Sequence, residues 1–163
     1  CKVNNPEELK KRLSELFNHS DLIIGQAFVP SAFDWRIGVL DNQPLFACKY
    51  YMSAGHWQIY NWNSSEKDPS GLTKTLPIEE VPRKVITTAL KAASLMGDGL
   101  YGVDLKEIDG KVFVIEVNDN PNIDSGIEDQ VLGKALYDRI INSIENRIEM
   151  SRNIARFVNV ELD

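Results

Sequence analysis

Residues 112–124, with the sequence VFVIEVNDNPNID, begin as an apolar strand and end in carboxylates and carboxamides. Alternate residues of a strand share a face, so Glu116 and Asn118 point the same way, and Asp104 lies on the strand-like segment before them. Oxygen donors without His or Cys suit Mg²⁺ or Mn²⁺, and Mg²⁺ commonly takes one or two protein carboxylates while phosphate oxygens and water complete its shell. The pattern predicts a metal site that binds a nucleotide; a solvated sheet face with aligned acids is the alternative.

The turn between these two strands decides whether the carboxylates share a face. With a two-residue turn, Asp104 would lie opposite Ile115, on the other face from Glu116. With a three-residue loop at 108–110, closed by a left-handed glycine, Asp104 would lie opposite Val114 and diagonal to Glu116, at about 7–8 Å. The predicted site therefore requires the three-residue loop.

A dinucleotide-binding pattern, G-x-G-x-x-G, is matched letter for letter by residues 97–102, GDGLYG. This stretch follows a predicted helix and leads into a predicted strand, the reverse of the order that places a pyrophosphate at a helix N-terminus. We therefore interpret it as a helix stop and a close approach between two backbones.

A calcium loop is an alternative for the acidic stretch, because asparagines alternate there and an acid stands at the twelfth position. The ligands of such a loop would be Asn118, Asn120, Asn122 and Asp129. However, Ile123 stands where the loop needs glycine, and a strand rather than a helix precedes it, so magnesium is favoured.

Hydrophobic periodicity predicts an α+β fold. Apolar residues at helical spacing predict helices over 6–18, over 82–96 and from 132 towards the C-terminus, the last with a break near Ser151. Runs of apolar and β-branched residues predict strands over 22–29, 35–40, 44–52, 100–107 and 111–118, with a short one over 57–61. A three-residue turn at 41–43 joins two strands, and the polar stretch 63–77 predicts a loop.

The bulk composition excludes several classes of protein. The chain has 163 residues, 43% of them apolar, and 18 basic against 24 acidic residues give a net charge of −6, which argues against a nucleic-acid partner. No apolar run reaches the roughly eighteen residues of a membrane span, and two cysteines are too few for a disulfide framework, so we expect a cytoplasmic protein. The chain opens at Cys1 without methionine, and we expect a fragment of a longer chain.

The chain resembles the ATP-grasp superfamily in Asp104, in the E-x-N triplet at 116–118 with the Asn-Pro after it, and in two upstream stretches, Gly25-Gln26-Ala27-Phe28-Val29 and Asp34-Trp35-Arg36. Within it, the likeness is to RimK-type ribosomal-protein glutamate ligases and bacterial glutathione synthetases, over about residues 1–150. It implies a C-terminal ATP-grasp subdomain over 30–163, with a mainly antiparallel sheet and flanking helices. Residues 1–29 would be the tail of the preceding subdomain and the hinge.

The resemblance implies ATP-dependent ligation of a carboxylate to an amine through an acyl-phosphate, with ATP and Mg²⁺ or Mn²⁺ as cofactors. By similarity, two magnesium ions that bridge the nucleotide phosphates are held by Asp104, Glu116 and Asn118. Adenine would be read by the backbone of Gln26, Ala27, Phe28 and Val29, and ribose would be bound by Asp34. The positive charge needed when a carboxylate attacks a γ-phosphate would come from Arg36 and Lys49.

Other positions bear on the substrate. By its place in that fold, the stretch 54–60 would line the substrate side, where His56 and Trp57 are candidate contacts and His56 is either a base for the amine or a structural residue. The family hinge usually has glutamate where Ala27 stands, and Asn120-Pro121-Asn122 replaces a small residue with Pro-Gly, so Asn120 marks a branch with its own acceptor. The family's phosphate-covering lysine and glycine-rich loop come earlier, so this fragment should have little ATP affinity of its own.

Two functions follow from these residues. The first is a ligase fragment, inactive alone and catalytic within the full chain, which joins a carboxylate substrate to an amino acid, peptide or protein. The second is a non-catalytic module of the same fold that binds a nucleotide or a protein partner. Retention of all three metal-ligand types favours the first. The sequence names neither acyl donor nor acceptor, and it leaves a homo-oligomer open.

Overall fold

The computed structural model describes residues 1–53, 58–59 and 71–160, and the chain forms two compact units, Cys1–Pro30 and Ser31–Asp163. The first unit contains helix α1 (Pro6–Leu16), which begins where the sequence predicts. The Asn5 side chain caps this helix by accepting a hydrogen bond from the Glu8 N–H at 2.8 Å, and Pro6 fits the first turn, where no N–H partner is needed.

The predicted strand over 22–29 is wrong. These residues follow α1 without regular secondary structure, and the side chains of Leu22 and Ile24 are 79% and 89% exposed. A strand needs a neighbour to complete its backbone hydrogen bonds, and none of the strand pairings among the described residues includes this segment. An apolar, β-branched run is therefore not sufficient for a strand.

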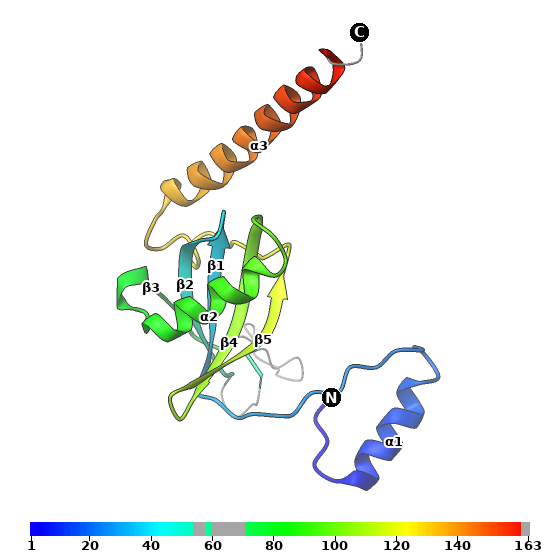
Figure 1. The fold of residues 1–163 in the computed structure, drawn as a ribbon. Helices are drawn as coiled ribbons and strands as arrows, with labels where there is room; N and C mark the ends of the chain where they lie inside the picture. The colour runs from blue at the N-terminus through cyan, green and yellow to red at the C-terminus, as the bar shows by residue number, and fades with distance from the viewer. Residues whose placement is uncertain (54–57, 60–70, 161–163) are drawn as a thin grey trace. The chain divides into compact units, whose positions relative to one another are not determined.

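The second unit is built on a five-stranded antiparallel sheet with the strand order β3-β2-β1-β4-β5 (Figure 1). Its strands are β1 (Phe33–Leu40), β2 (Gln43–Tyr51), β3 (Thr73–Leu76), β4 (Leu100–Ile108) and β5 (Lys111–Asn118). The unit also contains the short helix η1 (Ile78–Glu80) and the helices α2 (Arg83–Ser94) and α3 (Lys134–Val160). The predicted α+β class with a mainly antiparallel sheet is confirmed.

Some elements differ from the prediction. Strand β3 lies inside the stretch 63–77, for which the sequence predicts a loop, and its four residues pair with the edge of β2. Helix α3 continues through Ser151 without the predicted break. Most of the predicted strand 57–61 lies outside the described residues. No helix in the described part of the chain is long and apolar enough to cross a membrane.

Both hairpin turns contain two residues rather than the three predicted. Asp41 and Asn42 join β1 to β2 with φ values of 51° and 59°, and Asp109 and Gly110 join β4 to β5 with φ values of 49° and 69°. Positive φ at both central residues defines a type I′ turn, whose twist matches that of the strands. Asp, Asn and Gly are the residues that adopt this conformation at least cost.

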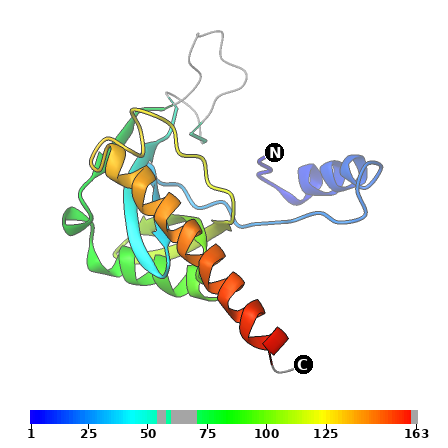
Figure 2. The same cartoon turned by 90° about the horizontal axis from the view of Figure 1, so that it is seen from above.

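Helix α2 covers one face of the sheet (Figure 2). It forms the main core with that face. Val85, Ala89 and Ala93 recur every four residues along the helix and are fully buried. The two alanines allow the helix to approach the sheet closely. The sheet contributes alternate side chains of β1 and β4, namely Trp35, Ile37, Val39, Val103 and Leu105.

The opposite face carries a second core, which includes residues of the segment 119–133 and the start of α3. This cover depends on Gly102, because a Cβ there would lie 2.8 Å from the Cβ of Pro121. Gly97, which follows α2, has a φ of 144°. Residues 97–102 thus combine a helix stop with a close approach, which at Gly102 is made by the Pro121 side chain.

Gly102→Ala is expected to destabilise the second unit by about 1–3 kcal/mol, because an added methyl group would overlap Pro121. Displacing Pro121 also disturbs Asn118, which pairs with Gly102 across the two strands. Thermal unfolding of the full-length protein checks this result. The matched control is Gly99→Ala, whose Cβ would meet only the Tyr101 ring, at 3.3 Å; equal stability of the two variants would contradict the close approach.

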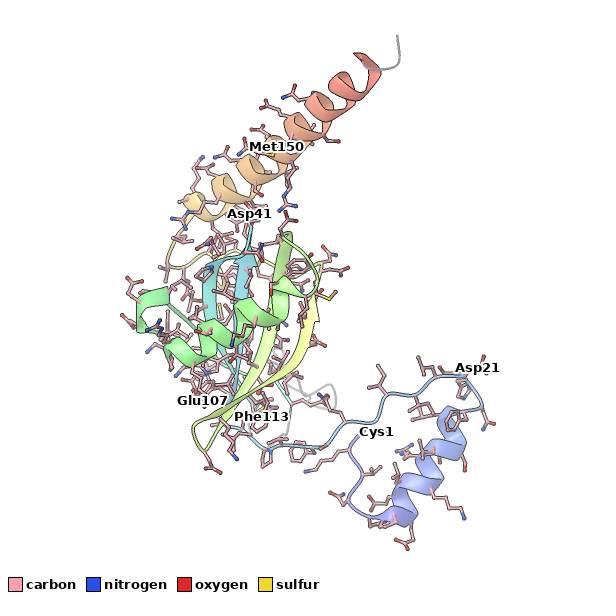
Figure 3. The ribbon with its side chains drawn as sticks, viewed as in Figure 1. Cys1, Asp21, Asp41, Glu107, Phe113 and Met150 are labelled. Atoms are coloured by element: carbon pink, nitrogen blue, oxygen red, sulfur yellow. The ribbon has the colours of Figure 1, made fainter. Side chains whose placement is uncertain are left out.

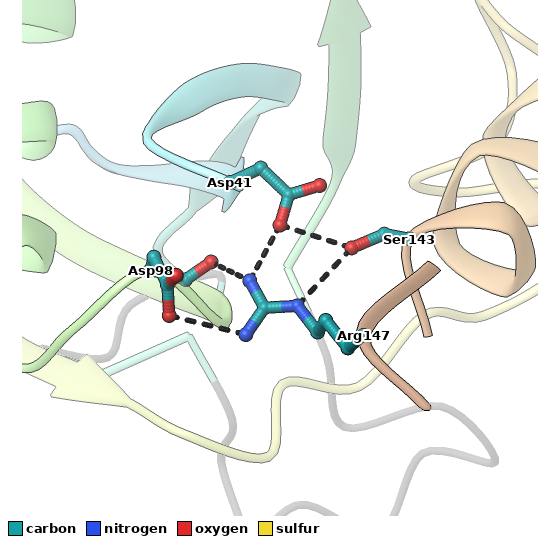
Figure 4. Close-up of polar contacts among 4 residues, drawn as sticks. All are labelled: Asp41, Asp98, Ser143 and Arg147. Carbon is teal, nitrogen blue, oxygen red and sulfur yellow. Dashed lines mark hydrogen bonds and ion pairs between the residues drawn. The ribbon is translucent and has the colours of Figure 1, made fainter. Parts of the chain in front are cut away.

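Arg147 ties α3 to two loops at one end of the sheet (Figure 4). Its guanidinium donates to Asp41 Oδ1 at 2.5 Å and to Asp98 Oδ1 at 3.1 Å, while the Ser143 hydroxyl donates to Asp41 at 2.9 Å. Figure 3 places Asp41 beside α3, with Glu107 and Phe113 towards the opposite end of the sheet. Exposed pairs of this kind contribute little each, so their main effect is to fix the direction in which α3 leaves the sheet.

Candidate nucleotide and metal site

A β-bulge restores the alignment that the two-residue turn would have broken. Along β4 and β5 the register shifts by one residue, so that Asp104 lies directly opposite Glu116 and Ile115 is the extra residue. Val112 and Val117 are five positions apart, yet both pack on the α2 core, which an unbroken strand does not allow. The predicted shared face is confirmed, although the carboxylates form a direct pair and not a diagonal one.

Asp104, Glu116 and Asn118 present two carboxylates and an amide from neighbouring strands. The Asn118 Oδ1 accepts a hydrogen bond from the Asn120 N–H at 2.9 Å, which turns the chain after β5. Glu116 is exposed, and within the described residues its carboxylate has no hydrogen-bond or ion-pair partner. An all-oxygen donor set fits Mg²⁺ or Mn²⁺, and these three residues are the ones that would hold it.

Arg36 on β1 binds the Asp104 carboxylate from the neighbouring strand. The two residues are paired in register, and Arg36 Nε and Nη2 donate to the two carboxylate oxygens at 2.8 Å each. The side chains are only 20% and 17% exposed. Hydrogen bonding to Asp104 raises the pKa of Arg36 above its ordinary value. The guanidinium also lies 5.2 Å from the centre of the Tyr50 ring, a cation–π contact that holds it at this face.

A second ion pair, not predicted from the sequence, adjoins the first on the same face. Lys106 donates hydrogen bonds to Asp34 Oδ1 and to the Ser31 hydroxyl, and that hydroxyl donates to the same Asp34 oxygen at 2.9 Å. Lys106 follows Asp104 by two positions, so strand periodicity alone could have identified it. Asp34, which the resemblance assigns to ribose, is therefore engaged by a lysine.

Lys49 lies on the face opposite Arg36. The β1–β2 register places Lys49 opposite Trp35, and its Nζ lies 4.2 Å from the centre of the Phe33 ring and 4.6 Å from that of Trp35. Arg36 instead lies opposite Cys48. Lys49 and Arg36 therefore lie on opposite faces of the sheet, because a one-residue offset in a strand reverses the face. A catalytic role for Lys49 stays a prediction.

Beside Arg36, a buried acid joins β2 to the segment after β5. Glu128 is 0% exposed, and its carboxylate accepts hydrogen bonds from the Tyr50 hydroxyl and from the Asp124 N–H, the latter at 2.7 Å. Burial, and to a smaller extent the hydrogen bond to Glu128, raise the pKa of the Tyr50 hydroxyl. Burial also raises the pKa of the Cys48 thiol to about 11. No sequence pattern marks Glu128, because an acid in a loop is usually solvated.

The structure does not test the other predicted site residues. The adenine-contact segment 26–29 belongs to the first unit, where Lys2 Nζ lies 3.8 Å from the centre of the Phe28 ring. His56 and Trp57 lie outside the described residues. Asn120 is exposed directly after β5. Their roles stay predictions.

The residues of the calcium pattern make local contacts instead. Asp129 accepts hydrogen bonds from the Gly126 N–H at 2.7 Å and from the Tyr137 hydroxyl at 3.0 Å. Asn118 accepts the hydrogen bond that turns the chain after β5. No cluster of three or more His, Cys, Asp or Glu side chains suited to a metal occurs in the described ranges. Asp129, the acid at the twelfth position of the pattern, is therefore bound by its own segment and by α3.

The face as a whole can bind a cation and a polyanion together. Three carboxylates, those of Asp34, Asp104 and Glu116, lie on one face of the sheet with the cations of Arg36 and Lys106. The unpaired carboxylate is the exposed one, so it is available to a divalent ion. Arg36 and Lys106 could donate hydrogen bonds to phosphate oxygens if Asp104 and Asp34 bound other groups instead of them.

The fold that carries this face is similar to that of part of a solved ligase. In the solved structures, the chain is similar to D-alanine–D-alanine ligase from Bacillus anthracis complexed with ATP, with a TM-score of 0.67 and 19% identity over 91% of this chain and 51% of that chain. A second structure of that enzyme gives a TM-score of 0.60 and 20% identity over the same shares, 91% and 51%. Neither a protein-family model nor a curated protein matches the chain.

A further similar structure is the ATP-grasp ligase PsnB complexed with a phosphomimetic variant of its minimal precursor, Mg and ADP. Its TM-score is 0.46, with 21% identity over 71% of this chain and 34% of that one. At these identities the likeness concerns the fold. The chain spans about half the length of the D-alanine–D-alanine ligase chains, at 51%.

Proposed function

We propose that this chain is part of an ATP- and Mg²⁺-dependent carboxylate–amine ligase that forms an acyl-phosphate and joins it to an amino acid, peptide or protein. The observation that carries this proposal is the direct opposition of Asp104 and Glu116, next to Arg36, on the face of the sheet opposite α2. The D-alanine–D-alanine ligase structure with a TM-score of 0.67 is complexed with ATP, which supports ATP as the nucleotide.

The chemistry explains why charge, and not a nucleophilic side chain, dominates the site. When a carboxylate attacks a γ-phosphate, two anions meet, and the barrier falls only if positive charge is already in place. A divalent ion at Asp104, Glu116 and Asn118 would supply part of that charge at the phosphates. Arg36 would contact the transferred group. The amine then displaces phosphate from the acyl-phosphate and gives the amide.

The remaining expectations are consistent with this function. Asp34 would accept hydrogen bonds from ribose, and the backbone of residues 26–29 would contact adenine. Cys1 and Cys48 are both free thiols, in keeping with a cytoplasmic enzyme. RimK-type and glutathione-synthetase-type ligases remain the families whose motifs suit these residues.

The test is acceptor-dependent release of ADP and phosphate by the full-length protein with Mg²⁺-ATP. A panel of amino acids and short peptides is supplied as acceptors, and glutamate is included as acyl donor. We expect release that requires both a carboxylate and an amine, with an amide as the product detected by mass spectrometry. Nucleotide binding without turnover on any substrate pair would exclude the ligase.

A non-catalytic nucleotide- or partner-binding module is the second candidate. It is favoured by the complete pairing of Asp104 with Arg36 and by Ala27, which replaces the usual hinge glutamate. Such a module would bind Mg²⁺-ATP, or a protein, without ADP release. The ADP-release assay therefore separates the two candidates directly.

A further inference from the structure

The two contacts between Arg36 and Asp104 are made to the atoms that a divalent ion would need. Both oxygens of Asp104 accept hydrogen bonds from Arg36, at 2.8 Å each. Glu116, which lies opposite Asp104 on β5, has no hydrogen-bond or ion-pair partner among the described residues. The two predicted carboxylate ligands therefore differ: the Asp104 carboxylate is neutralised by a cation and the Glu116 carboxylate is not.

We propose that Arg36 is a placeholder cation, which occupies Asp104 until a divalent ion displaces it and which is thereby released toward the anionic substrate. This inference rests on the proposed function, since it assumes that Asp104 is a metal ligand. It adds that metal binding and the availability of Arg36 are one coupled event. Arg36 opposes metal binding before the nucleotide arrives, and it assists the reaction afterwards.

Electrostatics supports the exchange. The Arg36 and Asp104 side chains are about four-fifths buried, at 20% and 17% exposure, so leaving Asp104 unpaired beside the Glu116 carboxylate would be costly. A guanidinium in two charge-assisted hydrogen bonds prevents that cost. The same contacts must be weakened or broken when an ion takes those oxygens, so the pair lowers the affinity for the ion.

The Tyr50 ring gives the released guanidinium a position on the same face. Its centre is 5.2 Å from the Arg36 guanidinium, and the ring is held by the hydrogen bond from its hydroxyl to the buried Glu128. Arg36 therefore keeps a second attractive contact after Asp104 turns to the ion. Lys106 lacks this arrangement, because its partner is Asp34, which lies two residues before Arg36 on β1 and is not one of the predicted metal ligands.

The experiment measures Mn²⁺ binding to the full-length protein without nucleotide, by electron paramagnetic resonance of free Mn²⁺ and by calorimetry. Arg36→Gln is expected to lower the Kd for Mn²⁺ about tenfold, because it frees both Asp104 oxygens and removes a repelling charge. Lys106→Gln is the matched control: it removes the same charge from the same face but leaves Asp104 paired. Its Kd should fall by less than about threefold through longer-range electrostatics alone.

Two further variants secure the interpretation. Arg36→Lys retains the charge without the bidentate contact and should give an affinity between wild type and Arg36→Gln; it also substitutes if Arg36→Gln does not fold, as judged by circular dichroism. Glu116→Ala should weaken binding in every background. Equal Mn²⁺ affinity in wild type and both Arg36 variants, or equal effects of Arg36→Gln and Lys106→Gln, would overturn the placeholder role alone. Binding that Glu116→Ala leaves unchanged would overturn the metal site and the proposed function with it.

Discussion

Glu116→Ala is expected to lower acceptor-dependent ADP release by the full-length protein by a factor of about 10²–10³. Glu116 is the exposed, unpaired carboxylate of the described site, and it faces Asp104 directly across the β4–β5 pair. A metal ion that polarises a phosphoryl oxygen contributes several kcal/mol to the barrier, and about 1.4 kcal/mol corresponds to a factor of ten. Loss of a ligand from a set with only two carboxylates should remove much of that contribution.

The kinetic signature separates a metal ligand from a merely structural acid. The Mg²⁺ concentration for half-maximal rate should rise in Glu116→Ala and partly recover in Glu116→Asp, while the unfolding midpoint stays close to that of wild type, because the side chain is exposed. Asp109→Asn is the matched control, since it removes one carboxylate from the same hairpin at a turn position with φ 49°, which Asn also accepts. Equal activity of Glu116→Ala and Asp109→Asn would contradict a metal-ligand role for Glu116.

The shared face of Glu116 and Asn118 could be predicted from the sequence, but the strand register that brings Asp104 to that face could not. Alternation of residues is local, so Glu116 and Asn118 could be placed on one face from their spacing. The position of Asp104 depends on two non-local facts, a two-residue turn at Asp109-Gly110 and a bulge at Ile115, and each alone would have separated the carboxylates. The predicted three-residue loop is wrong. It nevertheless puts Asp104 and Glu116 on the same face, because a two-residue turn followed by one extra residue in β5 shifts the pairing by an even number of residues relative to that loop.

The positions of the basic residues Lys49 and Lys106 also depend on the strand register, which the sequence does not reveal. Lys49 is adjacent in sequence to Cys48, which lies opposite Arg36, but that single step places it over the Phe33 and Trp35 rings on the other face. Lys106, two positions from Asp104, is at the site. A shift of one residue in the pairing of two strands moves a side chain to the opposite face of the sheet. A basic residue on a neighbouring strand therefore cannot be assigned to a site before the register is known.

Glu128→Ala is expected to destabilise the second unit by about 3–5 kcal/mol, a large share of the 5–15 kcal/mol typical of a domain. The carboxylate is fully buried and accepts from Tyr50 and from the Asp124 N–H, so its removal leaves two donors without their partner and a void between β2 and the segment that follows β5. For a protein of this size, the unfolding temperature should fall by roughly 10 °C or more.

A double-mutant cycle with Tyr50→Phe tests whether the buried pair is the cause. Tyr50→Phe keeps the ring beside Arg36 but leaves the Glu128 carboxylate without its hydroxyl donor, at a cost of about 1–3 kcal/mol. Once Glu128 is alanine, the hydroxyl has no partner to lose, so the same change should cost close to nothing. The coupling free energy, measured by denaturant unfolding, should therefore be about 1–3 kcal/mol. Strictly additive effects would mean that Glu128 stabilises the segment through packing alone and that Tyr50 is positioned beside Arg36 without it.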